Sequence, residues 1–170
     1  MKSKEIRFKY GTLWINPVQD VSSRNEILEV IETEKLSENY IISIHRRLSF
    51  QLGPVAPSGI LGATLYRNAT ERCSIELPNS AQYKELSDRY PKIITDSAQL
   101  QLAYTPINSR RIVFDYLVHH PIDSHPYVFA RLARCIVKIF ALEIDTLNSV
   151  TMQDIVELTN KQIKEEYNSK

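Results

Sequence analysis

Three of the four histidines of this chain fall within seven residues, and with one aspartate they form its densest group of potentially reactive side chains. The group consists of His119, His120, Asp123 and His125. Imidazole and carboxylate groups are common ligands of zinc and iron, and histidine is the most frequent general acid–base in enzymes. These residue types therefore point to a metal site or to a small enzyme that uses this turn for acid–base catalysis.

A structural role explains the same residues. Adjacent histidines at the end of a strand point to opposite faces, which works against a shared metal ion. Asp123 and Ser124 are also good N-cap residues for a helix that begins near Pro126. We therefore favour a capped turn without a bound cofactor, and keep metal binding and acid–base catalysis by the four side chains as alternatives.

The two cysteines do not suggest a nucleophile. Cys73 and Cys135 each lie in an apolar pattern and form no CxxC motif, which predicts two buried thiols in a reducing compartment. The four glycines form neither GxGxxG nor GxxxxGK[ST], which nearly excludes a phosphate-cradling loop. No apolar run reaches the length of a membrane span, and we expect a cytoplasmic protein with no membrane partner.

Arginines are the second candidate for chemistry. The net charge is only +1, from 21 basic and 20 acidic residues, so a large positive field for nucleic acid is not favoured. Local clusters remain at Arg46-Arg47, at Arg110-Arg111 and along Arg131, Arg134 and Lys138. If the fold brings them together they could bind phosphates in an RNA- or ribosome-associated module. The alternative is that they pair with nearby carboxylates or solvate the edges of the core.

The chain is organised around the segment Arg111–Leu142. A strand over Arg111–Val118 is predicted to present one apolar face, made of Ile112, Phe114, Tyr116 and Val118. The helix that follows is apolar on nearly every side, with its three cations confined to one exposed stripe. This pattern predicts a central core helix near residues 126–142.

The other predicted elements follow from hydropathic periodicity and turn residues. In the long strand predicted over Tyr40–Leu52, Arg46 falls on the apolar face. It therefore requires a carboxylate partner, a position at the sheet rim or a β-bulge. In chain order the predictions are a strand over Ile6–Ile15 bent at Gly11, a helix over Arg24–Glu34, a strand over Tyr40–Leu52, a loop over Gly53–Gly59, an antiparallel hairpin of Ile60–Tyr66 with Arg72–Leu77, a short helix ended by Pro91, a strand over Ala98–Tyr104 that pairs antiparallel with Arg111–Val118, and a last helix from Thr151 with a frayed tail over Lys164–Lys170.

This order of elements is typical of an α+β protein. We expect a single globular domain over residues 1–170, with a largely antiparallel sheet of about five or six strands and three to four helices packed on one face. The run His120–Ser124, with Phe129 following, resembles the strand–loop–helix passage in domain IV of elongation factor G. The glycine-rich lead of that domain and its GTPase region have no counterpart here, so the resemblance implies no function.

The composition favours recognition over catalysis. Nine tyrosines in a compact chain of near-zero net charge are typical of a protein that binds another protein, because tyrosine is enriched at interfaces. Our hypothesis is a non-catalytic binding domain, such as an inhibitor or a toxin-neutralising immunity-type protein. The binding residues predicted from the pattern are Arg47, Tyr66, Arg131 and Arg134.

Overall fold

The computed structural model describes residues 3–16, 29–32, 44–52, 59–67, 72–77, 89–105, 107, 110–119 and 124–169. For residues 29–32, 44–48, 67 and 119 it describes the backbone alone. The strands are β1 (Lys4–Phe8), β2 (Gly11–Ile15), β3 (Glu29–Glu32), β4 (Ile44–Leu52), β5 (Gly59–Arg67), β6 (Ser74–Glu76) and β7 (Arg110–His119). The helices are α3 (Arg89–Tyr104), α4 (Pro126–Phe140), a 3-10 turn η1 (Ile144–Thr146) and α5 (Ser149–Asn168).

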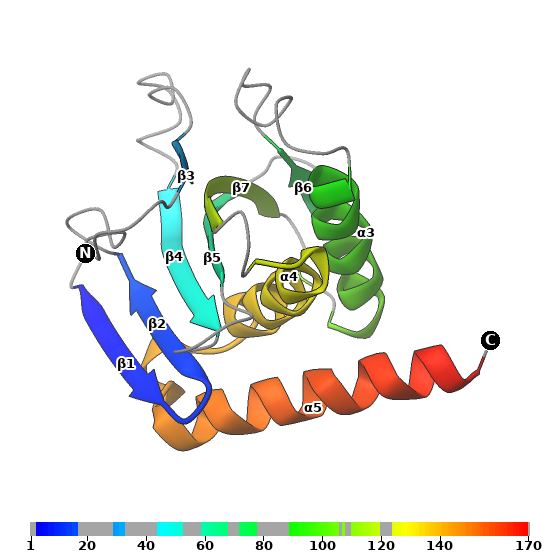
Figure 1. Ribbon diagram of the computed structural model, residues 1–170. Helices are drawn as coiled ribbons and strands as arrows, with labels where there is room; N and C mark the ends of the chain where they lie inside the picture. The colour runs from blue at the N-terminus through cyan, green and yellow to red at the C-terminus, as the bar shows by residue number, and fades with distance from the viewer. Residues whose placement is uncertain are drawn as a thin grey trace.

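The strands form one mostly antiparallel sheet, which confirms the predicted α+β class. Their order is β1-β2-β4-β5-β7-β3, with β6 also paired to β7. Figure 1 shows β1, β2, β4 and β5 following one another across the sheet. The far edge of β7 is divided between two short strands. The antiparallel strand β3 pairs with Tyr116–His119, and β6 pairs in parallel with Arg111–Val113.

The core helix is confirmed. Helix α4 contacts β4 and β5 and is flanked by α3 and α5 (Figure 1). Eleven of its fifteen residues are buried, among them Phe129, Leu132, Ile136 and Phe140. Among the described residues, neither this helix nor any other is long and apolar enough to cross a membrane.

The prediction of one bent strand over Ile6–Ile15 is wrong, because the chain turns back on itself at Lys9 and Tyr10. Strands β1 and β2 form a tight hairpin, in which Phe8 pairs with Gly11. Gly11 also pairs with Leu52 of β4, and a Cβ atom there would lie 1.9 Å from the carbonyl oxygen of Gln51. The glycine is therefore required by the close approach of two backbones and does not mark a bend.

The predicted helix over Arg24–Glu34 is wrong where it is described. Residues Glu29–Glu32 form β3, and the rest of that prediction lies outside the described residues. Val30 and Ile31 are β-branched and suit a strand, and pairing with β7 satisfies their backbone groups. A tertiary partner has therefore decided the conformation of this short segment.

The strand predicted over Ala98–Tyr104 is also wrong, because this segment belongs to helix α3. Leu100 and Tyr104, which supplied the apparent alternation, are 41% and 59% exposed. Pro91 lies in the first turn of the helix, where no backbone N–H is needed, and does not end an element. The buried face of α3 consists of small and polar residues as well as isoleucine, and therefore gives a weak hydropathic signal: Ile94, Ser97, Ala98 and Gln101.

The pairing and register of the strands correct two further predictions. Strand β6 pairs with β7 and not with β5, so the predicted hairpin is wrong. Between the pairs Gly62–Tyr116 and Thr64–Val113, β7 has one more residue than β5, which is a bulge. The bulge moves Tyr116 and Val118 off the face of Ile112 and Phe114 and into a small cluster with Ile60. A shift between Ile44 and Arg46 in β4 confirms the bulge alternative for that arginine.

The last helix is confirmed and is longer than predicted. Met152, Ile155, Val156 and Thr159 are buried as expected. The helix does not fray at Lys164 but continues to Asn168, and its C-terminal half extends away from the sheet (Figure 1). The predicted tail is therefore a structured part of the molecule's surface.

Candidate functional site

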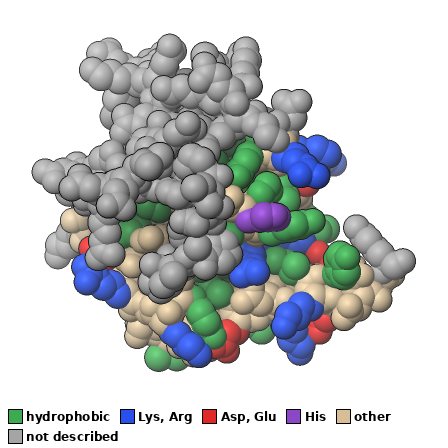
Figure 2. Space-filling view, viewed as in Figure 1, with side chains coloured by type: hydrophobic (Ala, Val, Ile, Leu, Met, Phe, Trp, Pro, Cys, Tyr) green, Lys and Arg blue, Asp and Glu red, His purple; other side chains and the backbone are tan. Residues whose placement is uncertain are grey.

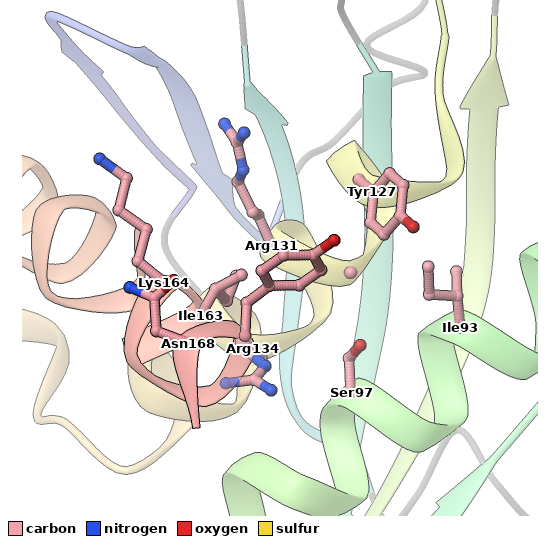
Figure 3. Close-up of a pocket in the computed structure, with 10 residues that line it drawn as sticks. Ile93, Ser97, Tyr127, Arg131, Arg134, Ile163, Lys164 and Asn168 are labelled. Carbon is pink, nitrogen blue, oxygen red and sulfur yellow. The ribbon is translucent and has the colours of Figure 1, made fainter. Parts of the chain in front are cut away.

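A groove of about 560 Å³ lies between α3, α4 and α5 (Figure 3). The residues come from one face of each helix, because their spacings of three and four positions place them on the same side. We call this feature the three-helix groove, and it is lined by Ile93 and Ser97 of α3, by Tyr127, Ala130, Arg131 and Arg134 of α4, and by Ile163, Lys164, Tyr167 and Asn168 of α5.

Arg134 holds α5 against α4. Its Nη1 donates to Oε1 of Glu166 at 2.9 Å and its Nη2 to Oε2 at 2.6 Å, which makes a bidentate pair. The arginine is only 5% exposed, and a guanidinium buried to this degree needs such a partner. The expectation that Arg134 lies on an exposed stripe is therefore wrong, because the structured end of α5 covers it.

Lys138 is also covered by α5. Its Nζ donates to Thr159 Oγ1 at 2.9 Å and to Gln162 Oε1 at 2.7 Å. Burial is the main cause that lowers the pKa of Lys138, with the nearby charge of Arg134 acting in the same direction. Of the three cations on the predicted exposed stripe, Arg131 alone is exposed.

The rim of the groove combines exposed aromatic rings with free cations. Tyr127 is 66% exposed and Tyr167 is 83% exposed. Arg131 and Lys164 are exposed, and neither forms an ion pair or hydrogen bond with a described residue. Figure 3 shows both cations extending to the same side. In Figure 2 basic and hydrophobic side chains lie side by side on this face.

The cap of α4 is His125 and not Asp123 or Ser124. Its Nδ1 accepts a hydrogen bond from the N–H of Tyr127 at 3.3 Å, and the two rings stack with centroids 5.0 Å apart. The prediction of Asp123 or Ser124 as the cap is therefore wrong, and the turn before Ser124 lies outside the described residues. Through this stack the cap also supports one side of the groove.

The alternative metal site lies largely outside the described residues. His120 and Asp123 are not described, and His119 is described by its backbone in β7 alone. Within the described part of the chain, no three histidine, cysteine, aspartate or glutamate side chains gather in a way that could hold a metal ion. Metal binding and acid–base catalysis at this turn therefore stay predictions.

The two thiols are protected from ionisation. Burial raises the pKa of Cys135 to about 11, although a hydrogen bond with Thr159 and nearby cations lower it. Burial likewise raises the pKa of the half-buried Cys73 to about 11, against the effect of Arg110. Both thiols stay protonated near neutral pH and are poor nucleophiles.

Tyr66 belongs to a separate polar cluster in the sheet. It was expected at the surface but is 1% exposed, and the guanidinium carbon of Arg111 lies 6.0 Å from the centre of its ring. Arg111 also forms an ion pair with Glu76 at 2.5 Å. In the same sheet, Thr64 Oγ1 donates to Oδ2 of the buried Asp115 at 2.6 Å. We name these five residues the sheet polar cluster.

Two of the four predicted binding residues therefore meet in one site. Arg131 and Arg134 both line the three-helix groove, Tyr66 lies elsewhere, and Arg47 belongs to β4 with its side chain outside the described residues. Tyr127 and Tyr167 were missed. From the sequence, Tyr127 was assigned to the core helix and Tyr167 to a frayed tail. The helical spacing of Ile163, Lys164 and Tyr167 was a signal that could have identified the second tyrosine.

Comparison of the chain with protein-family models, with curated proteins and with solved structures gave no match.

Proposed function

We propose that this protein is a non-catalytic domain that binds another protein through the three-helix groove. The observation that carries the proposal is that Tyr127 and Tyr167 are exposed around an apolar floor, together with two cations, Arg131 and Lys164, that have no partner among the described residues. Tyrosine and arginine are among the residues enriched at the centres of protein interfaces, because they bury large rigid or bidentate groups. A surface of this composition is suited to recognition.

The chemistry of the described side chains supports binding over turnover. Arg134 and Lys138 are committed to α5, and burial keeps the thiols of Cys73 and Cys135 protonated. The side chains at the groove offer positive charge, hydrogen-bond donors and apolar surface. We propose that this chain acts in the manner of an inhibitor or a toxin-neutralising immunity-type protein.

The tyrosines allow a direct test with a matched control. Wild-type protein, the Tyr127→Ala/Tyr167→Ala double variant and Leu158→Ala would each be used for affinity capture from the source cell, followed by mass spectrometry. Leu158 is 58% exposed on α5 and does not line the groove. We expect a specific protein to be retained by the wild type and by Leu158→Ala, and to be lost with the double variant.

The size of the expected loss follows from interface energetics. Truncation of a hot-spot tyrosine costs about 2 kcal/mol or more, roughly a 30-fold weaker affinity. Circular dichroism would confirm that the double variant is folded. Retention of the same protein by all three forms would remove the groove from the interface, and the absence of any specific protein would contradict the binding function itself.

A further inference from the structure

The charge of the three-helix groove is not balanced within the described part of the chain. Arg131 and Lys164 carry free positive charge at the rim, whereas the charge of Arg134 is compensated by Glu166. No carboxylate is found among the residues that line the groove. Desolvating two like charges without a partner is unfavourable, so a complementary ligand brings negative charge to this position.

The apolar surface of the groove is elongated. Ile93, Ala130 and Ile163 line it, and the stripe of α3 that carries Ile93 and Ser97 continues to Leu100 and Tyr104 at spacings of four, three and four. Both of these later residues are exposed. From Ile93 to Tyr104 the stripe is about 16 Å long at 1.5 Å per residue, which matches about three turns of a ligand helix.

The volume of the groove limits which parts of a ligand can enter it. A space of about 560 Å³ is in the range of pockets that enclose small ligands or several side chains, and does not hold a whole helix. An amphipathic helix that binds in a groove inserts side chains at positions i, i+3, i+4 and i+7 and keeps its backbone outside. The groove and the α3 stripe together fit this mode of recognition.

We propose that the three-helix groove binds an acidic amphipathic helix of the partner protein. Its carboxylates pair with Arg131 and Lys164, and its apolar side chains pack on Ile93, Ala130, Ile163 and the α3 stripe. This inference rests on the proposed protein-binding function and names the chemistry of the partner. Single-stranded RNA is the competing ligand, since it also uses cations and aromatic rings, but a phosphate backbone is bound by a longer row of cations than two.

A displayed library of random peptides of about 16 residues, roughly four helical turns, provides a probe that needs no identified partner. The wild type would be compared with Arg131→Glu/Lys164→Glu and with Lys9→Glu/Lys161→Glu. The second pair of lysines is exposed and outside the groove, and the two double variants change the net charge equally. Selected peptides would then be synthesised and their affinities measured by fluorescence anisotropy.

The wild type and the Lys9/Lys161 variant are expected to enrich peptides with aspartate or glutamate on one side and apolar residues at helical spacing. Their affinity should fall roughly tenfold or more with the Arg131/Lys164 variant, as interface charge pairs are lost and replaced by repulsion. Enrichment of non-acidic peptides, no enrichment, or equal losses in both variants would overturn the inference, as would tighter groove-dependent binding of a labelled poly(U) oligonucleotide. A captured partner protein that is insensitive to the Arg131/Lys164 change would leave the binding function standing and reject the acidic helix.

Discussion

Charged side chains have partners in the sheet polar cluster, whereas two cations at the rim of the three-helix groove have none among the described residues. In the sheet, Arg111 is paired with Glu76 and Asp115 accepts a hydrogen bond from Thr64. At the rim, Arg131 and Lys164 have no partner in the described part of the chain. An unpaired charge costs several kcal/mol, on the order of its desolvation free energy, when it is buried, and little when it is exposed to water. The paired charges therefore belong to the fold, and the unpaired ones are left for a ligand.

Helix α4 contains the same contrast within one turn. Arg134 is 5% exposed and bound to Glu166, and Arg131, three residues earlier, is exposed. Figure 3 shows the two side chains pointing in opposite directions. Two arginines of one helix thus differ in role because one faces α5 and the other faces solvent. Substitutions of the buried residues of α4 should therefore act mainly on folding stability, and substitution of the exposed Arg131 mainly on binding.

The largest expected effect is on the buried side. Phe140→Ala should lower the free energy of unfolding by about 3–5 kcal/mol, because it removes a ring that is 5% exposed and leaves a cavity. Urea denaturation followed by circular dichroism measures this change. An unchanged denaturation midpoint would contradict the burial of this face of α4.

Arg134→Ala should cost about 2–3 kcal/mol of folding stability. The change leaves Glu166 without its bidentate partner, and the cost is below that of a fully buried pair because the glutamate side chain is 29% exposed. The double variant Arg134→Ala/Glu166→Ala should regain part of the loss in a double-mutant cycle. Additive effects of the two single changes would show that the pair does not tie α5 to α4.

The thiol of Cys135 should make folding stability depend on pH in the alkaline range. Burial raises its pKa in the folded protein to about 11 from an ordinary value of 9.0. The neutral thiol therefore contributes its whole stabilisation below pH 9. This contribution is lost as the pH rises toward 11, and the free energy of unfolding should fall by up to about 2 kcal/mol. Denaturation of wild type and Cys135→Ala at several pH values should show a steeper decline for the wild type, and equal slopes would contradict the raised pKa.

The smallest effect on folding should come from the groove side. Arg131→Ala is expected to change stability by less than about 0.5 kcal/mol, because the side chain is exposed and has no described partner. The same change should weaken binding to the captured partner. A large loss of stability would show that Arg131 is part of the fold and would remove the contrast with Arg134.

The sequence was informative where hydrophobicity followed one strong period. The strand and helix at Arg110–Phe140 were predicted because nearly every buried position there is apolar. Helix α3 was missed because its buried face includes Ser97 and Gln101, which carry no hydropathic signal. The bulge in β7 was missed because one added residue shifts the face of every later side chain without altering the local pattern.

The site was less predictable than the fold. Arg131 and Arg134 were selected for their stripe on α4, but their different environments depend on where α5 packs, which no local pattern contains. Tyr167 was assigned to a frayed tail because the end of α5 is rich in charge. The Arg134–Glu166 pair, 32 positions apart, joins that end to α4 and turns it into one wall of the groove.

The position of α4 and α5 in the chain has a consequence for synthesis on the ribosome. All seven strands in the described part of the chain precede Pro126, so the apolar residues that face the helices, such as Leu13, Phe50 and Leu61, are made long before α4 can cover them. At roughly 5–20 residues per second, the first strands wait roughly 6–25 s for this helix to begin. During that interval the nascent sheet exposes apolar surface, so a chaperone that binds extended apolar segments would be needed most before residue 126 is made.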